Sequence, residues 1–235
     1  MRAFIDLHCH TSASFDCLAS PESVVRAAAK RGLTHLAVTD HDRIEGALRA
    51  RDTAPAGLTV IVGEEVKTAD GDLIALFLER AVPPGRPAAE TIAAVREQGG
   101  LVGIPHPFDQ HRGSMLKDPR LAATGALVDW VEAYNARVIG GSGNERAAAF
   151  ARELGLPGIA ASDAHSVVEV GVAYNIVEGD PSTPAGLLAA LRAMEIVPGR
   201  ASYIVRTLTP ISKLVNRARG NTRVPWSSAG PSGDA

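Results

Sequence analysis

The chain has 235 residues, of which 46% are hydrophobic and 21% charged, so it holds enough apolar material for one large soluble domain. Its formal net charge of −2 gives no electrostatic reason to expect stable binding of duplex nucleic acid. Two cysteines form no disulfide framework, and neither a signal peptide nor a bilayer-spanning run is evident, so the expected compartment is the cytoplasm.

Strands and helices are predicted to alternate along the chain. In the first predicted helix, Ser20 fits the N-cap, Pro21 the first helical position and Gly32 the end. The residues 69–72, "ADGD", predict a hairpin turn between two strands. The predicted strands cover 4–10, 34–42, 58–66, 73–78, 101–107, 127–135, 157–165 and 172–177, and the predicted helices cover 20–32, 44–54, 88–98, 144–155 and 184–194.

Repeated strand–helix units predict a parallel sheet with right-handed crossovers. In such folds functional side chains gather at the carboxyl ends of the strands. Most of these apolar strands end in His, Asp or Glu. From about Gly220 onward, the Pro, Gly and Ser content is typical of a disordered end.

The first strand ends in two histidines, within "FIDLHCHTSASFD". Because side chains alternate along a strand, His8 and His10 are expected on one face together with Phe4 and Asp6, and Cys9 on the other. Two imidazoles on a rigid strand end suit a metal ion. Taken alone, such a short pair is more often a pair of surface histidines at a strand end.

The other strand ends enlarge this set beyond the three or four protein ligands that one zinc ion takes. Several carboxylates crowded together with histidines indicate two or three ions, whose charge would relieve carboxylate repulsion. The set consists of His8, His10, Asp16, Asp40, His41, Asp42, Glu65, His106, Glu132, Asp163 and His165.

Some acids and histidines near these ends have structural interpretations. Asp40 and Asp42 could instead cap the helix that follows them. His35 lies at the wrong end of its strand and is interpreted as structural, whereas His111, in a loop, is ambiguous. Glu64 and Glu65 point to opposite faces of their strand, so only one of them can enter the site.

The motifs "DLHCHT", "TDHD", "GEE", "PHP", "VEAYN" and "SDAH" resemble, in order and spacing, those of the PHP family, named for polymerase and histidinol phosphatase. The resemblance implies an α/β fold, a distorted (β/α)7 TIM-like barrel with a trinuclear metal centre at the C-terminal rim of its strands. It implies a PHP catalytic domain over residues 1–205, followed over 206–235 by a C-terminal helix and a disordered tail.

The resemblance also implies a ligand set. It gives His8, His10, Glu65 and Asp163 to a first ion, with Glu65 rather than Glu64 bridging to a second ion that is also held by His106 and Glu132. Asp16, His41 and His165 would hold the third ion. Asp16 and Glu132 stand where some members have His, and these carboxylates favour manganese or iron over zinc.

The function expected from the resemblance is that of a metal-dependent phosphoesterase with a metal-bridging hydroxide as nucleophile and with Glu65, Asp163 and His165 in catalytic positions. The expected partner is a small phosphorylated substrate, a phosphomonoester or a nucleotide phosphate. An amidohydrolase acting on a carbonyl and a non-catalytic metal-binding module are the alternatives. Four residues near the rim could contact phosphate, although a solvated role fits each of them as well: Lys67, Arg112, Asn135 and Arg137.

Overall fold

The computed structural model describes residues 1–109, 120–140, 142–202, 205 and 208–225. Its helices are α1 (Pro21–Lys30), α2 (Glu45–Asp52), α3 (Ala88–Arg96), α4 (Arg120–Gly125), α5 (Ser142–Leu154), α6 (Pro184–Leu191) and α8 (Leu208–Ala218). Its strands are β1 (Arg2–Asp6), β2 (His35–Val38), β3 (Thr59–Lys67), β4 (Asp72–Leu76), β5 (Leu101–Ile104), β6 (Trp130–Asn135), β7 (Gly158–Ala161), β8 (Tyr174–Glu178) and β9 (Met194–Val197).

The strands form one mixed sheet in the order β7-β6-β5-β4-β3-β2-β1-β8-β9. The pairs β1–β2, β2–β3, β5–β6 and β6–β7 are parallel, as repeated strand–helix units predict. Strand β4 is antiparallel to β3, which confirms the hairpin. Strand β8 is antiparallel to β1, because the chain reaches it from β7 through a loop without the helical crossover that a parallel neighbour needs.

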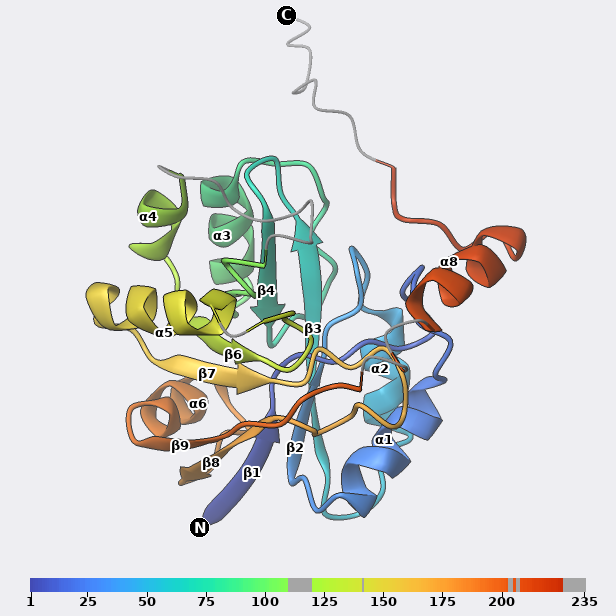
Figure 1. Ribbon diagram of the computed structural model, residues 1–235, viewed down its shortest axis with the longest axis horizontal. Coiled ribbons are helices and arrows are strands. Elements are labelled where there is room, and N and C mark those ends of the chain that lie inside the picture. The colour runs from blue at the N-terminus through green and yellow to red at the C-terminus, as the bar shows by residue number, and fades with distance from the viewer. Residues whose placement is uncertain (110–119, 141, 203–204, 206–207, 226–235) are drawn as a thin grey trace, which may run out of the picture.

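The sheet curls into a nearly closed barrel, which confirms the predicted TIM-like fold (Figure 1). At the rim, the segment after β1 pairs with the segment after β7 through a parallel bridge between Cys9 and Ala164. Below the rim, the side-chain amide of Asn175 forms hydrogen bonds to backbone atoms of β7 and β1, as the backbone of a neighbouring strand would. Its Oδ1 accepts from Ala160 N at 2.7 Å, and its Nδ2 donates to Ala160 O at 2.7 Å and to Ile5 O at 3.3 Å.

Most of the apolar strand residues belong to two large clusters. One fills the barrel and includes Ile5, Ile61 and Trp130. The other lies under the helices and includes Val62 and Val66 of β3. Glu65 therefore shares the inner face with Ile61, and Glu64 shares the outer face with Val62, as the period of two predicts for β3.

The alternation expected for the first strand is wrong below the histidines. Ile5 and Leu7 pack inside the barrel, whereas Cys9 packs under the helices and Phe4 lies against that outer cluster. The regular strand ends at Asp6, so the period of two does not continue to His8. The histidines still reach the interior, but Phe4 does not share their face.

The helix boundaries follow the predicted caps closely. The Ser20 side chain accepts from Ser23 N at the start of α1. The sequence did not predict the short helix α4 or the strand β9, which pairs with β8. Within the described residues, no helix is both long and apolar enough to cross a membrane.

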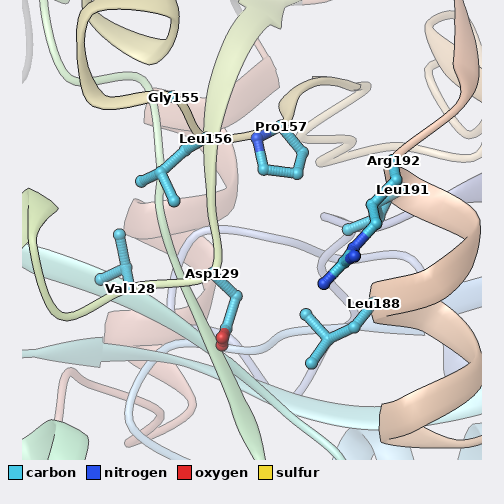
Figure 2. Close-up of a pocket in the computed structure, with 8 residues that line it drawn as sticks. All are labelled: Val128, Asp129, Gly155, Leu156, Pro157, Leu188, Leu191 and Arg192. Carbon is cyan, nitrogen blue, oxygen red and sulfur yellow. The ribbon is translucent and has the colours of Figure 1, made fainter.

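A hollow of about 640 Å³ opens at the amino ends of β6 and β7, beside α6. Figure 2 shows Asp129 on one side of it and Arg192 on the other. In α/β barrels the reactive groups lie at the carboxyl ends of the strands. The hollow is at the opposite end from the histidines and belongs to no site described below.

Candidate metal centre

The nine predicted metal ligands gather at the carboxyl rim, and each is at most 9% exposed. His41 follows β2, Glu65 lies in β3, His106 follows β5 and Glu132 lies in β6. The loop between β1 and α1 supplies His8, His10 and Asp16, and the loop after β7 supplies Asp163 and His165. Parallel strands therefore bring together residues that are up to 157 positions apart in sequence, from His8 to His165.

Glu65 lies at the centre of the group. Its Oε2 is 3.4 Å from His8 Nε2, 3.4 Å from His10 Nε2 and 3.2 Å from His41 Nδ1. Its Oε1 is 3.3 Å from His106 Nε2. Oε2 is buried and has no hydrogen-bond partner among the described residues, although three imidazole nitrogens surround it.

A second group lies beside the first. Asp16 Oδ2 is 3.5 Å from His41 Nε2 and 3.4 Å from His165 Nε2. Donor atoms of His10, Asp16, His41 and His165 lie within 4.8 Å of one another, and so do those of His8, His10 and Glu65. His10 therefore belongs to both groups.

Three of the histidines are oriented by a polar partner at Nδ1, here called the outer ring nitrogen. His8 Nδ1 lies 2.6 Å from Glu132 Oε1, and His165 Nδ1 lies 2.9 Å from the carbonyl oxygen of Asp163. His10 Nδ1 lies 3.1 Å from Ser14 Oγ, which donates to Asp40 Oδ1 at 2.7 Å. If each Nδ1 carries the proton, each Nε2 presents its lone pair to the interior, which is the arrangement of metal-binding histidines.

The charges in this group are strongly coupled. Burial opposes ionisation of Glu65, but His41 and His8 outweigh it and hold the pKa of Glu65 well below its usual range. Burial likewise opposes protonation of His41, but Glu65 and Asp16 raise its pKa to about 9. Burial and the neighbouring His165 lower the pKa of His10 well below its usual value, which leaves its lone pair free for a cation.

These residues fit divalent metal ions. A buried carboxylate oxygen without a hydrogen bond, faced by three imidazole nitrogens, is a set of donors arranged around a cation. In addition, His106 and Asp163 adopt left-handed backbone conformations, with φ of +27° and +52°. Such backbone strain in non-glycine residues is concentrated at functional sites.

Glu132 has a different environment from the other acids. Its Oε1 lies against His8 Nδ1, and its Oε2 accepts from His106 N and from Asn135 Nδ2, both at 2.9 Å. The same amide of Asn135 donates to Asp163 Oδ2 at 3.0 Å. Both oxygens of Glu132 are thus engaged by protein donors, and its role as a direct ligand stays a prediction.

The predicted substrate contacts are already engaged with protein partners. Arg137 donates to Glu169 Oε1 at 2.6 Å and to Thr209 Oγ1 at 2.7 Å. Lys67 Nζ pairs with Asp72 Oδ1 at 3.4 Å, and the Asn135 amide holds two carboxylates. A contact of these residues with phosphate stays a prediction. Arg112 and His111 lie outside the described residues.

The helix-cap interpretation of Asp40 and Asp42 is wrong, since the N-cap of α2 is Ile44 and no side chain caps it. Asp40 instead accepts from Thr11 N at 2.6 Å, and Asp42 accepts from Lys67 N at 2.7 Å. Both acids fasten loops at the rim.

Two further expectations concern side chains away from the interior. His35 begins β2, far from the site, and lies 3.0 Å from Ser182 Oγ, in keeping with a structural role. Glu64 points away from the site, as predicted. It is fully buried rather than solvated, and it accepts from Val82 N at 2.8 Å.

Sequence reasoning missed several residues that border the site. The Phe15 ring lies 5.0 Å from the His41 ring, with Lys213 and Arg223 over it at 5.4 and 5.7 Å. Arg223 Nε donates to Asp42 Oδ2 at 2.8 Å. Arg223 lies 181 positions after Asp42, and Lys213 and Arg223 both come from the far end of the chain, so no local pattern could have revealed these contacts.

The family models decide the relationship. A model described as PHP domain matches residues 6–147, more than half of the chain and every predicted metal ligand except Asp163 and His165. The chain belongs to the PHP domain family. A second model, described as PHP-associated, matches residues 141–196 of this PHP protein and includes those two ligands.

Relatives of this PHP protein include an uncharacterized protein of Methanocaldococcus jannaschii, 35% identical over 114 residues, which are 44% of this chain and 67% of that protein. A solved structure from Bacteroides vulgatus is a two-domain protein described as containing a predicted PHP-like metal-dependent phosphoesterase. It matches this chain with a TM-score of 0.71 and 20% sequence identity, and the match covers 85% of this chain and 65% of that one. An amidohydrolase from Chromobacterium violaceum has a TM-score of 0.57 and 17% identity over 87% of this chain and 95% of that one. At these identities the solved structures show a shared fold.

Proposed function

We propose that this PHP protein is a metal-dependent phosphoesterase that hydrolyses a small phosphomonoester or a nucleotide phosphate. The observation that carries the proposal is the position of Glu65, whose buried Oε2 lies within 3.4 Å of three imidazole nitrogens without a hydrogen bond. The phosphoesterase named in the description of the Bacteroides vulgatus structure supports the choice of reaction.

The proposal divides the nine predicted ligands among three ions. His8, His10, Glu65 and Asp163 would hold a first ion, Glu65, His106 and Glu132 a second, and Asp16, His41 and His165 a third. When bound, such ions lower the pKa of water to near neutrality and neutralise charge on the phosphate oxygens. The many carboxylates favour manganese or iron over zinc.

The protein's own contribution is to hold these donors in place. Glu132 and Ser14 orient His8 and His10 through their outer nitrogens, and the Asn135 amide fixes the spacing of Glu132 and Asp163. These groups are almost fully buried, so they lie in surroundings of low dielectric constant. Electrostatic interactions with a bound phosphate are stronger in such an environment.

The test combines metal content with turnover. Protein purified without chelator and supplied with manganese is expected to hold two or three ions and to release phosphate from a panel of phosphomonoesters and nucleotides. A chelator should abolish release, and manganese should restore it. Asp163→Asn should lose activity, whereas Asp52→Asn, at an exposed position of α2, should not. Absence of metal binding after reconstitution would contradict the proposal.

An amidohydrolase is the second candidate, because a protein of that description shares the fold over most of both chains. Both reactions use a metal-activated water. Assaying amides and lactones beside the phosphoesters separates the two. Turnover of the amides or lactones, without turnover of the phosphoesters, would favour the amidohydrolase. Metal binding without turnover of either panel would favour a non-catalytic module.

A further inference from the structure

The C-terminal segment of residues 208–225, here called the strap, consists of α8 and the chain that follows it to Pro225. It lies on the same side of the barrel as α1 and α2 (Figure 1). The two family models match residues 6–147 and 141–196, so the strap lies outside both. Composition alone assigns the chain from about Gly220 onward to a disordered end, yet Asn221, Thr222 and Arg223 make specific contacts.

The strap binds the loop that carries Asp16. In that loop, residues 11–17, several carbonyl oxygens accept hydrogen bonds from two asparagines of the strap. Asn216 Nδ2 donates to Ser14 O at 3.2 Å and to Cys17 O at 2.9 Å. Asn221 Nδ2 lies 3.1 Å from Ser12 O and 3.3 Å from the carbonyl oxygens of Ala13 and Ser14.

Further contacts fix the strap at both ends. Thr209, near its start, accepts from Arg137 beside the metal centre, and the first turn of α8 lines a hollow together with His165. Near its end, Arg223 pairs with Asp42, one residue after the predicted ligand His41. Arg43 donates to Asn221 Oδ1 at 3.2 Å and to Thr222 O at 3.1 Å. The strap therefore joins the three loops that carry the second group of donors, those of Asp16, His41 and His165.

Asp16 depends on this support more than the other members of its group. His41 and His165 extend from the ends of β2 and β7, whereas Asp16 lies ten residues past β1, in a loop without helix or strand. Its Oδ1 is buried and has no hydrogen-bond partner among the described residues. Among the described residues, the carboxylate of Asp16 contacts only the two histidines His41 and His165.

We propose that the strap completes the third metal position, by holding the 11–17 loop so that Asp16 meets His41 and His165. The inference rests on the metal centre of the proposed function. Asn216 and Asn221 are then positioning residues that act through Asp16. Partners of this kind behind metal ligands change metal affinity by about ten- to a hundredfold when they are removed.

The test compares Asn216→Ala/Asn221→Ala with wild type in the full chain, by measuring manganese bound per chain over a series of free manganese concentrations. The double variant is expected to bind one ion fewer at the concentration that just saturates wild type. That ion should return at about ten- to a hundredfold higher manganese. Arg217→Ala, exposed on the same helix, is the matched control and should titrate as wild type.

Two more measurements separate positioning from general stability. The melting temperature of the metal-free double variant should stay close to that of metal-free wild type, and amide hydrogen exchange should accelerate at residues 12–17. Asn221→Ala alone, at a half-buried position, serves if the double variant fails to fold.

An unchanged manganese titration in these variants would overturn the proposal, as would loss of all ions together with a lowered metal-free melting temperature. If wild type itself bound no metal, the proposed function would fail as well, so the two failures are distinguishable.

Discussion

The paired substitutions Glu65→Gln and Glu64→Gln test the geometry of β3. Glu65 places one oxygen beside three imidazoles and the other beside His106, so a single substitution disturbs four histidines at once. Glutamine keeps the size of the side chain but removes the charge that any two bridged ions would share. Losing one such transition-state interaction costs on the order of 10²–10³ in rate, and we expect at least that loss together with weaker metal binding.

Glu64→Gln should leave metal content and rate nearly unchanged, because the Glu64 side chain faces the outer cluster. Burial raises the pKa of Glu64 to about 8, so the carboxyl group is mostly neutral at pH 7. Glutamine keeps an oxygen that can accept from Val82 N. The substitution therefore replaces one neutral acceptor with another.

The same pKa predicts a difference in stability with pH. In the unfolded chain the Glu64 carboxyl has its ordinary pKa of 4.5. Between this value and about 8, unfolding releases a proton, so the wild-type free energy of unfolding falls as the pH rises, by about 1.4 kcal/mol per pH unit from this group. The contribution is complete below pH 4.5 and is lost as the pH passes 8. Glu64→Gln should lack this slope.

The assays are kcat and bound manganese for the rate comparison, and urea unfolding of metal-free protein at pH 6, 7 and 8 for the stability comparison. The protein is first freed of metal with a chelator, because bound ions would change the pKa of Glu64. If Glu64→Gln lost metal and activity while Glu65→Gln kept both, the assignment of inner and outer faces in β3 would be refuted. Equal pH slopes in wild type and Glu64→Gln would refute the argument from burial.

Two further predictions concern the support of the site and of the barrel. Glu132→Gln leaves only one acceptor oxygen for the donors that the two carboxylate oxygens now share, so His8 should lose its fixed orientation. Manganese affinity should then fall by about ten- to a hundredfold in an equilibrium titration, and unchanged affinity would contradict this role of Glu132. Gly103→Ala would drive a methyl group into the Trp130 indole. Urea unfolding should therefore show a free energy of unfolding lower by about 1–3 kcal/mol, and Trp130→Phe in the same chain should recover part of the loss.

The parts of the site that the sequence revealed are those encoded near strand ends. "DLHCHT", "TDHD" and "SDAH" place their histidines and acids beside a strand, and the parallel arrangement of the strands then brings them together without further information. The choice of Glu65 over Glu64 followed from the family spacing, and the inner face of β3 agrees with it.

The remaining features depend on contacts between distant segments. His8 meets Glu132 across 124 positions, and Asn216 meets Cys17 across 199, and neither pairing leaves a local periodicity. The composition of the segment after Gly220 predicts disorder, yet Asn221 and Arg223 bind the rim, because single polar side chains can fasten an otherwise irregular chain.

The side chain of Asn175 has a mechanical consequence for the barrel. Most neighbouring strands are joined by backbone ladders, which resist separation over several residues at once. Between β7 and β8, the hydrogen bonds seen among the described residues come from the side-chain amide of Asn175. The barrel is therefore expected to separate first between β7 and β8. The rim has its own connection, the Cys9–Ala164 bridge, so loss of the Asn175 contacts is expected to open the barrel below the rim before it disturbs the spacing of the histidines.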